Sequence, residues 1–127
     1  MSSLKMILIV DDDRDFADSL TEILELQGHR VTVLPGGEEV VTNYDEKDFD
    51  LAFIDIKLSG MSGLECLRAL RAVRPNANVV LMTGDNTEQY WQEAMDAGAL
   101  QVLQKPFDPY QLLELVKHNF STSGNAT

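Results

Sequence analysis

The chain has 127 residues, which is a typical length for one compact domain. Hydrophobic residues make up 44% of it, and 21 acidic residues against 10 basic ones give a net charge of −11. We therefore expect no direct binding to nucleic acid or to a membrane surface, because both require clustered Lys and Arg. The single cysteine excludes an internal disulfide. No apolar run is long enough for a signal peptide or a membrane span, so we expect a cytoplasmic protein.

The first half of the chain predicts three strands and two helices. Short apolar, β-branched runs are typical of strands, here Met6–Val10, Arg30–Leu34 and Leu51–Ile54. Between the first two, a helix is expected with Asp13 as its N-cap and Gly28 as its stop, because apolar residues recur there at helical spacing: Phe16, Leu20, Ile23 and Leu24. A short, weakly patterned helix is expected over Glu38–Tyr44.

The second half continues the alternation of strands and helices. Strands are predicted at Val79–Met82 and Gln101–Leu103, and helices at Leu64–Arg74, Thr87–Ala97 and after a capping box at Asp108–Gln111. This pattern predicts a single α/β domain with a doubly wound, five-stranded parallel sheet and five helices. We assign residues 1–120 to the domain and residues 121–127 to a flexible tail or the start of a linker.

Polar residues follow four of the predicted strands. Asp11 and Asp12 come after the first, Asp55 after the third, Thr83 after the fourth and Lys105 after the fifth. In a doubly wound sheet the ligand site lies beyond the carboxyl ends of the strands. We therefore expect these side chains to converge at one edge of the sheet.

Such a set of side chains suits phosphoryl transfer. Converging carboxylates repel one another and favour a hard cation such as Mg²⁺, with Asp12 and Asp55 as direct ligands. Asp11 would act through water, and the backbone carbonyl of Lys57 would supply a further oxygen. A carboxylate that is desolvated and aligned against a phosphorus is able to form an acyl phosphate, so the set suits phosphoryl transfer to an aspartate. Lys105 and Thr83 would then neutralise or bind the phosphoryl oxygens.

The motifs at these positions resemble those of the receiver domains of two-component response regulators. They are Ile7–Asp13, Phe53–Ile56, Gly60–Gly63, Leu81–Gly84, Ala97–Ala99 and Lys105–Phe107. The resemblance covers nearly the whole chain and implies the strand order 2-1-3-4-5. It also implies phosphorylation of Asp55 by a histidine kinase or phosphotransfer protein, with Thr83 as the switch hydroxyl. An output partner would then bind the face formed by the fourth helix, fifth strand and fifth helix. A phosphorylation-dependent homodimer is a further expectation of the resemblance.

Several residues near the predicted site differ from the family pattern or carry a prediction of their own. The family usually has an aromatic residue where this chain has Val102, so the usual aromatic rotation is not available here. Ser59 replaces a proline that is frequent in the family. Lys57 and Asp85 occupy positions that in the family tune the lifetime of the acyl phosphate, and their opposite charges are able to pair over the site. The resemblance also predicts a cis peptide bond before Pro106. Trp91 lies on one helical stripe with Ala94 and Met95, which is either core or an exposed partner surface.

Other functions fit less well. A Mg²⁺-dependent aspartyl-phosphate phosphatase of the haloacid dehalogenase type would need an acid at position 57, where the chain has Lys57. A flavodoxin-like cofactor binder would need a phosphate loop after the first strand in place of Asp11–Asp13. A degenerate scaffold receiver would not retain the acids, Thr83 and Lys105. A receiver module of a hybrid kinase remains an alternative context. We thus expect a signalling domain and not an enzyme with a separate substrate.

Overall fold

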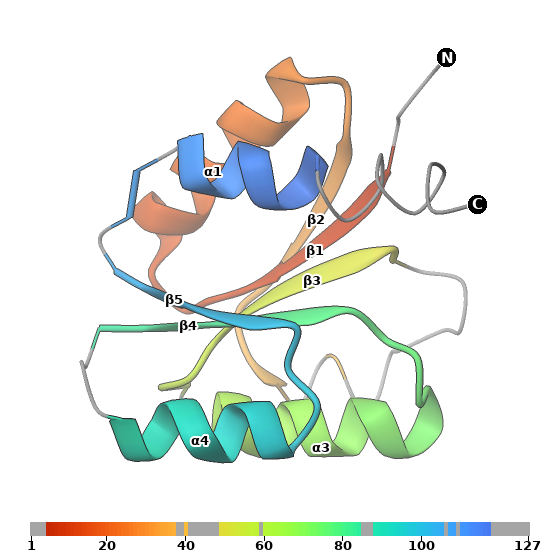
Figure 1. Cartoon of the computed structure of the whole chain (residues 1–127). Coiled ribbons are helices and arrows are strands. Elements are labelled where there is room, and N and C mark those ends of the chain that lie inside the picture. The colour runs from red at the N-terminus through yellow and green to blue at the C-terminus, as the bar shows by residue number, and fades with distance from the viewer. Residues whose placement is uncertain are drawn as a thin grey trace.

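A computed structural model describes residues 5–37, 40, 49–58, 60–84, 88–105, 107–108 and 110–117. Its centre is a parallel sheet of β1 (Met6–Val10), β2 (Arg30–Leu34), β3 (Leu51–Asp55), β4 (Val79–Thr83) and β5 (Gln101–Gln104). The strand order is β2-β1-β3-β4-β5, as predicted, and Figure 1 shows it crossing the middle of the molecule. The winding reverses between β1 and β3, which places the switch point of the sheet there.

Helices cover both faces of the sheet (Figure 1). Helix α1 (Arg14–Leu26) and the helical residues 110–117 lie on one face, and α3 (Gly63–Val73) and α4 (Glu88–Asp96) lie on the other. These are four of the five predicted helices. Most of the helix predicted over 38–44 lies outside the described residues, as does the predicted tail at 121–127.

The central strands β1, β3 and β4 are apolar up to their last residues, as expected for strands that are buried on both faces. Alternate residues of β1, β3 and β4 point to opposite sides and join two separate hydrophobic clusters. The cluster under α1 and residues 110–117 includes Ile9, Phe53 and Met82, whereas the cluster under α3 and α4 includes Ile54 and Leu81. These two cores hold the strand ends in fixed register.

The helix ends follow local chemistry. The side chain of Asp13 accepts a hydrogen bond from the Phe16 amide and caps α1, as predicted. Gly98, at φ 103°, follows the end of α4 in a backbone conformation that favours glycine. Helix α3 begins with a capping box between Ser62 and Glu65, a feature that the helix predicted from Leu64 onward did not include.

Three strands are one residue longer than predicted. Strands β3, β4 and β5 end at Asp55, Thr83 and Gln104, so Asp55 and Thr83 belong to the ladder itself. Asp55 pairs with Met82, and Thr83 pairs with Gln104. The positions of Asp55 and Thr83 are therefore fixed by sheet pairing and not by a loop.

Candidate functional site

The predicted site residues meet at the carboxyl edge of the sheet. Backbone hydrogen bonds continue past the strand ends: the Lys105 amide donates to the Thr83 carbonyl oxygen at 2.7 Å, and the Ile56 amide donates to that of Met82 at 2.8 Å. Asp11 and Thr83 are wholly buried, and Asp55 is 8% exposed. Carboxylates are seldom buried to this degree unless they have charged partners.

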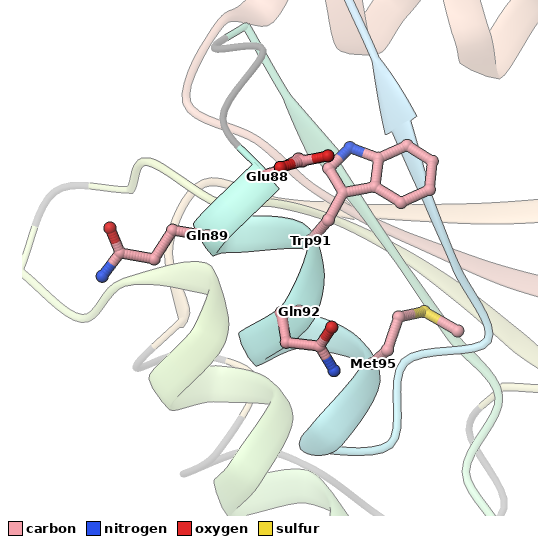
Figure 2. Close-up of a pocket in the computed structure, with 5 residues that line it drawn as sticks. All are labelled: Glu88, Gln89, Trp91, Gln92 and Met95. Atoms are coloured by element: carbon pink, nitrogen blue, oxygen red, sulfur yellow. The ribbon is translucent and has the colours of Figure 1, made fainter.

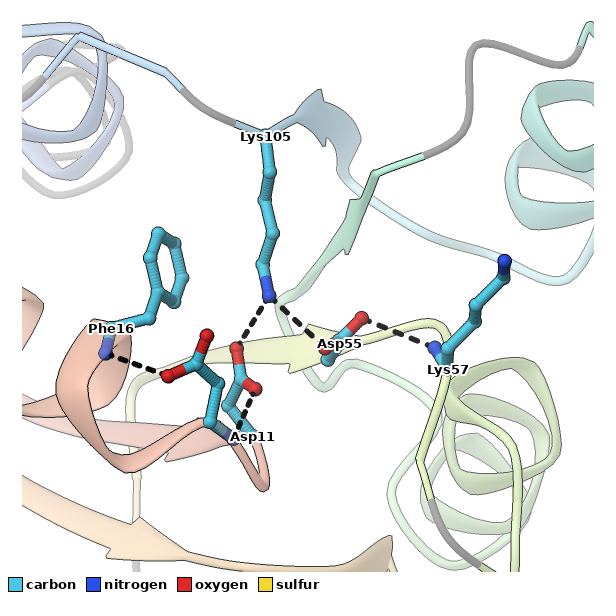
Figure 3. A network of polar contacts seen from close by, with 6 residues as sticks. Asp11, Phe16, Asp55, Lys57 and Lys105 are labelled. Atoms are coloured by element: carbon cyan, nitrogen blue, oxygen red, sulfur yellow. Dashed lines mark hydrogen bonds and ion pairs between the residues drawn. The ribbon is translucent and has the colours of Figure 1, made fainter.

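The ammonium of Lys105 is the partner of both buried carboxylates. Its Nζ donates to Asp11 Oδ2 at 2.8 Å and to Asp55 Oδ2 at 3.0 Å (Figure 3). The two carboxylates come from neighbouring strands, β1 and β3, and the lysine reaches them from the end of β5. This single cation therefore holds together three chain segments that are distant in sequence.

Backbone amides hold the remaining oxygens of the same carboxylates. The Asp13 amide donates to Asp11 Oδ1 at 2.9 Å, and the Lys57 amide donates to Asp55 Oδ1 at 3.1 Å. Figure 3 shows the Lys57 side chain directed away from the carboxylates, so its contribution to Asp55 is through the backbone. Each buried carboxylate thus has its orientation fixed from two sides.

Three carboxylates lie close enough to share one cation. Ligand oxygens of Asp11, Asp12 and Asp55 all lie within 4.8 Å of one another, and Asp12 is exposed while the other two are buried. Three negative charges and the one positive charge of Lys105 leave a formal charge of −2. This charge and the oxygen-only donor set fit a hard divalent cation such as Mg²⁺. The cluster predicted from the sequence therefore has the composition of a magnesium site.

The burial of the site changes the proton affinities of its groups. Burial raises the pKa of Asp11, and the nearby Asp55 charge adds to this effect, against the hydrogen bonds from Lys105 and the Asp13 amide. Burial alone would lower the pKa of Lys105. Its hydrogen bonds to Asp11 and Asp55, together with their charges, outweigh that effect and raise the pKa above its ordinary value. Lys105 is therefore held firmly in its charged form.

The sequence analysis missed one residue at the site. It assigned Phe16 to the apolar stripe of a helix, but the Phe16 ring lies 4.2 Å from the Lys105 Nζ, measured to the ring centroid. Helical periodicity alone gives no signal for this contact. The position of Phe16 in the first turn after the acidic residues is the only hint in the sequence.

Some predicted features of the site fall outside the described residues. These are Ser59, Asp85 and Pro106, so the predicted cis bond and the pairing of Lys57 with Asp85 remain predictions. Val102, which replaces the usual aromatic residue, is buried at 2% exposure on β5.

A second surface of interest lies on α4. Trp91 and Met95 are 43% and 46% exposed, whereas Ala94 is buried. The prediction that this stripe belongs to the core is therefore wrong for Trp91 and Met95, and the alternative of an exposed surface applies to them. Figure 2 shows both side chains beside a hollow that Glu88, Gln89 and Gln92 complete. Trp91 also lines a second hollow, of about 450 Å³, along β5. Two exposed apolar side chains, Trp91 and Met95, are therefore present where the resemblance placed the output face.

The family model for the response regulator receiver domain matches residues 7–117. The chain belongs to this family. The receiver domain is 32% identical to the transcriptional regulatory protein ZraR of Salmonella typhimurium, over 87% of this chain and 25% of that protein. The chain thus spans only about a quarter of the length of that relative.

Solved structures agree with the family assignment. A CheY-like response regulator receiver domain protein from Methanospirillum hungatei has a TM-score of 0.89 at 34% identity, over 98% of this chain and 100% of that one. A chain of the CheX-CheY-BeF3-Mg+2 complex from Borrelia burgdorferi has a TM-score of 0.84 at 29% identity, over 90% of this chain and 87% of that one. The protein is therefore a receiver domain of the kind found in two-component response regulators. In the described part of this domain, no helix is long and apolar enough to cross a membrane.

Proposed function

We propose that this receiver domain accepts a phosphoryl group on Asp55 from a histidine kinase or a phosphotransfer protein. The observation that supports this most strongly is the arrangement around Asp55. Its carboxylate is fixed between the Lys105 ammonium and the Lys57 amide, beside the carboxylates of Asp11 and Asp12. A nucleophile with a fixed orientation and a cation beside it are the main requirements for this transfer.

The proposed reaction is a nucleophilic substitution at phosphorus. A carboxylate oxygen of Asp55 forms a bond to the phosphorus while the N–P bond of the phosphohistidine breaks, and the imidazole leaves with its electron pair and takes a proton. Lys105 already donates to Asp55 Oδ2, and a small rotation of its ammonium redirects that donor to a phosphoryl oxygen. Thr83, buried at the end of β4, is the proposed donor to a second phosphoryl oxygen.

The acidic cluster is the proposed site of Mg²⁺. Asp12 and Asp55 would hold the ion directly, Asp11 would do so through water, and the Lys57 carbonyl would add an oxygen. When bound, the ion supplies positive charge that neutralises the phosphoryl oxygens. The formal charge of −2 at the cluster supports this assignment, and the Borrelia burgdorferi relative was solved with Mg²⁺ and beryllofluoride.

The output of the domain is proposed to pass through α4, β5 and the helical residues 110–117. Val102 is β-branched and buried, and it has no ring that could rotate between two positions as an aromatic side chain would. A shift at Thr83 would then reach the surface through the packing of α4. Its exposed Trp91 lies over β5 and lines a hollow together with Val102.

The test is phosphorylation by acetyl phosphate in the presence of Mg²⁺. We expect one phosphoryl group per chain by intact mass spectrometry, and borohydride reduction should convert Asp55 alone to homoserine. Asp55→Asn should abolish labelling. Asp50→Asn, directly before the same strand and so at the opposite edge of the sheet, is the matched control and should be labelled normally. Full labelling of Asp55→Asn, or an unlabelled native chain, would refute the proposal.

A further inference from the structure

The ammonium of Lys105 has a third neighbour besides its two carboxylates. It lies over the ring of Phe16, with Nζ 4.2 Å from the ring centroid, which is within the distance of a cation–π contact (Figure 3). The lysine side chain is only 19% exposed, so water screens this contact weakly. The contact should therefore be stronger than those seen between exposed side chains.

Two contacts position Phe16, one through its backbone and one through its ring. Its backbone amide donates to Asp13 Oδ1 at 3.2 Å, in the cap that starts α1. Its ring makes an edge contact with Phe107, with centroids 5.7 Å apart and an angle of 86° between the planes. Phe107 follows Lys105 by two residues, so the same segment supplies both the cation and the aromatic support.

The ring attracts the ammonium without fixing the direction of its N–H donors, whereas a third carboxylate would fix one of them. A lysine ammonium has three donors, and two of them are committed to Asp11 and Asp55. The face of a ring attracts the whole charge and does not require one N–H to point in one direction. The ammonium is therefore able to turn a donor from Asp55 to an incoming phosphoryl oxygen while it stays in place.

We propose that Phe16 is a positioning residue for phosphoryl transfer and acts through the π face that it presents to Lys105. This inference rests on the proposed transfer to Asp55 and adds a residue to it. An aliphatic residue at position 16 would fill much of the same space but would leave the half-buried ammonium without this attraction. The electronic character of the ring, and not only its volume, then sets the rate of phosphoryl uptake.

The experiment separates these two properties by replacing Phe16 with phenylalanines that carry one, two, three or five ring fluorines. Fluorination weakens the negative face of the ring with little change in its size. We expect the rate of uptake from acetyl phosphate with Mg²⁺ to fall steadily along the series, by roughly two- to tenfold at its end. Phe16→Leu should be slowed to a similar degree, and Phe16→Trp should restore the rate because indole is the best π partner.

Phe49 provides a matched control. Its ring also has a cationic neighbour, with the Arg74 guanidinium carbon 6.0 Å from its centroid, but it precedes β3 and so lies at the opposite edge of the sheet from Asp55. The same fluorinated series at Phe49 should leave the rate unchanged. Urea unfolding of every variant checks that the rates do not merely follow stability.

The outcomes distinguish this inference from the function on which it rests. A native chain that takes up no phosphoryl group would overturn both. A native chain that is phosphorylated at Asp55, with rates that stay level across the Phe16 series or with Phe16→Leu as fast as the native chain, would overturn only the role of Phe16. Rates that follow the unfolding free energies would equally overturn it, because they would assign Phe16 a packing role alone.

Discussion

Replacing Gly63 by alanine should damage the site without touching any charged group. A Cβ atom at this position would lie 2.2 Å from the backbone oxygen of Asp55 and 2.6 Å from the Cα of Ile56. A carbon and a carbonyl oxygen come no closer than about 3.3 Å, so α3 and the end of β3 must separate by about 1 Å. That movement would strain the hydrogen bond from the Gly63 amide to the Ile56 carbonyl oxygen, which is now 2.9 Å long.

The expected cost combines two effects. Overpacking against backbone costs about 1–3 kcal/mol, and a weakened hydrogen bond adds about 1 kcal/mol, so we expect Gly63→Ala to lose about 2–4 kcal/mol. With a slope of about 1–3 kcal/mol per molar urea, the unfolding midpoint should fall by roughly 1 M or more. Phosphoryl uptake should also slow, because the displaced backbone carries Asp55.

Gly84→Ala is the control for this prediction. Gly84 follows Thr83 at the same edge of the sheet, yet a Cβ there would meet no atom within 4 Å, and its φ lies outside the left-handed region. Alanine should therefore leave stability unchanged or raise it by up to about 1 kcal/mol through the unfolded state. Equal midpoints for Gly63→Ala and the native chain in urea, followed by circular dichroism, would refute the packing argument.

Three further predictions concern metal, pH and output. Mg²⁺ at 10 mM should raise the free energy of unfolding of the native chain by about 1.4 kcal/mol if its dissociation constant is about 1 mM. Asp12→Ala should abolish this increase. An equal increase in both proteins would contradict the metal assignment. Burial, and secondarily the charge of Lys5, lowers the pKa of His29 in the folded chain below its ordinary value of 6.5. The unfolded chain therefore binds a proton at His29 more tightly than the folded chain does. The stability due to neutral His29 is thus present above pH 6.5 and is lost as the pH falls below that value. Urea unfolding between pH 8 and 5.5 should therefore show a smaller acid loss in His29→Asn, and parallel profiles would exclude this role. Beryllofluoride should change the fluorescence of Trp91, the only tryptophan, and Val102→Ala should leave phosphoryl uptake largely intact; a silent Trp91 or an inactive Val102→Ala would argue against output through α4.

The sheet and the charged part of the site were predictable because both depend on short, local patterns. An apolar run followed by an acid marks a strand end, and parallel strands must bring such ends to one edge. These patterns predict that Asp11, Asp55 and Lys105 lie together, and the contacts of Lys105 with both carboxylates agree with this. The prediction erred by one residue at the ends of β3, β4 and β5, since a strand end is set by ladder pairing as well as by composition.

The contacts that the sequence did not reveal depend on side-chain direction. Helical periodicity assigns Phe16 and Trp91 to apolar stripes, but it does not say whether a stripe ends under a lysine or in solvent. The role of Gly63 was likewise invisible, because the atoms that crowd it belong to the backbone of β3. These features arise from the distance between elements, which a single sequence does not encode in any local pattern.

The bridge made by Lys105 also has a consequence for how the protein matures. Its partners Asp11 and Asp55 lie 94 and 50 residues earlier in the chain, so within the described domain these contacts can form only after most of the sheet has been synthesised. Contacts of such long sequence separation form late, after the intervening elements have collapsed and paired. A chain that stops before Lys105 would have its acids but not the cation that orients them. Acceptance of a phosphoryl group at Asp55 would therefore become possible only once the fold is complete, and incomplete chains would not be phosphorylated by a kinase.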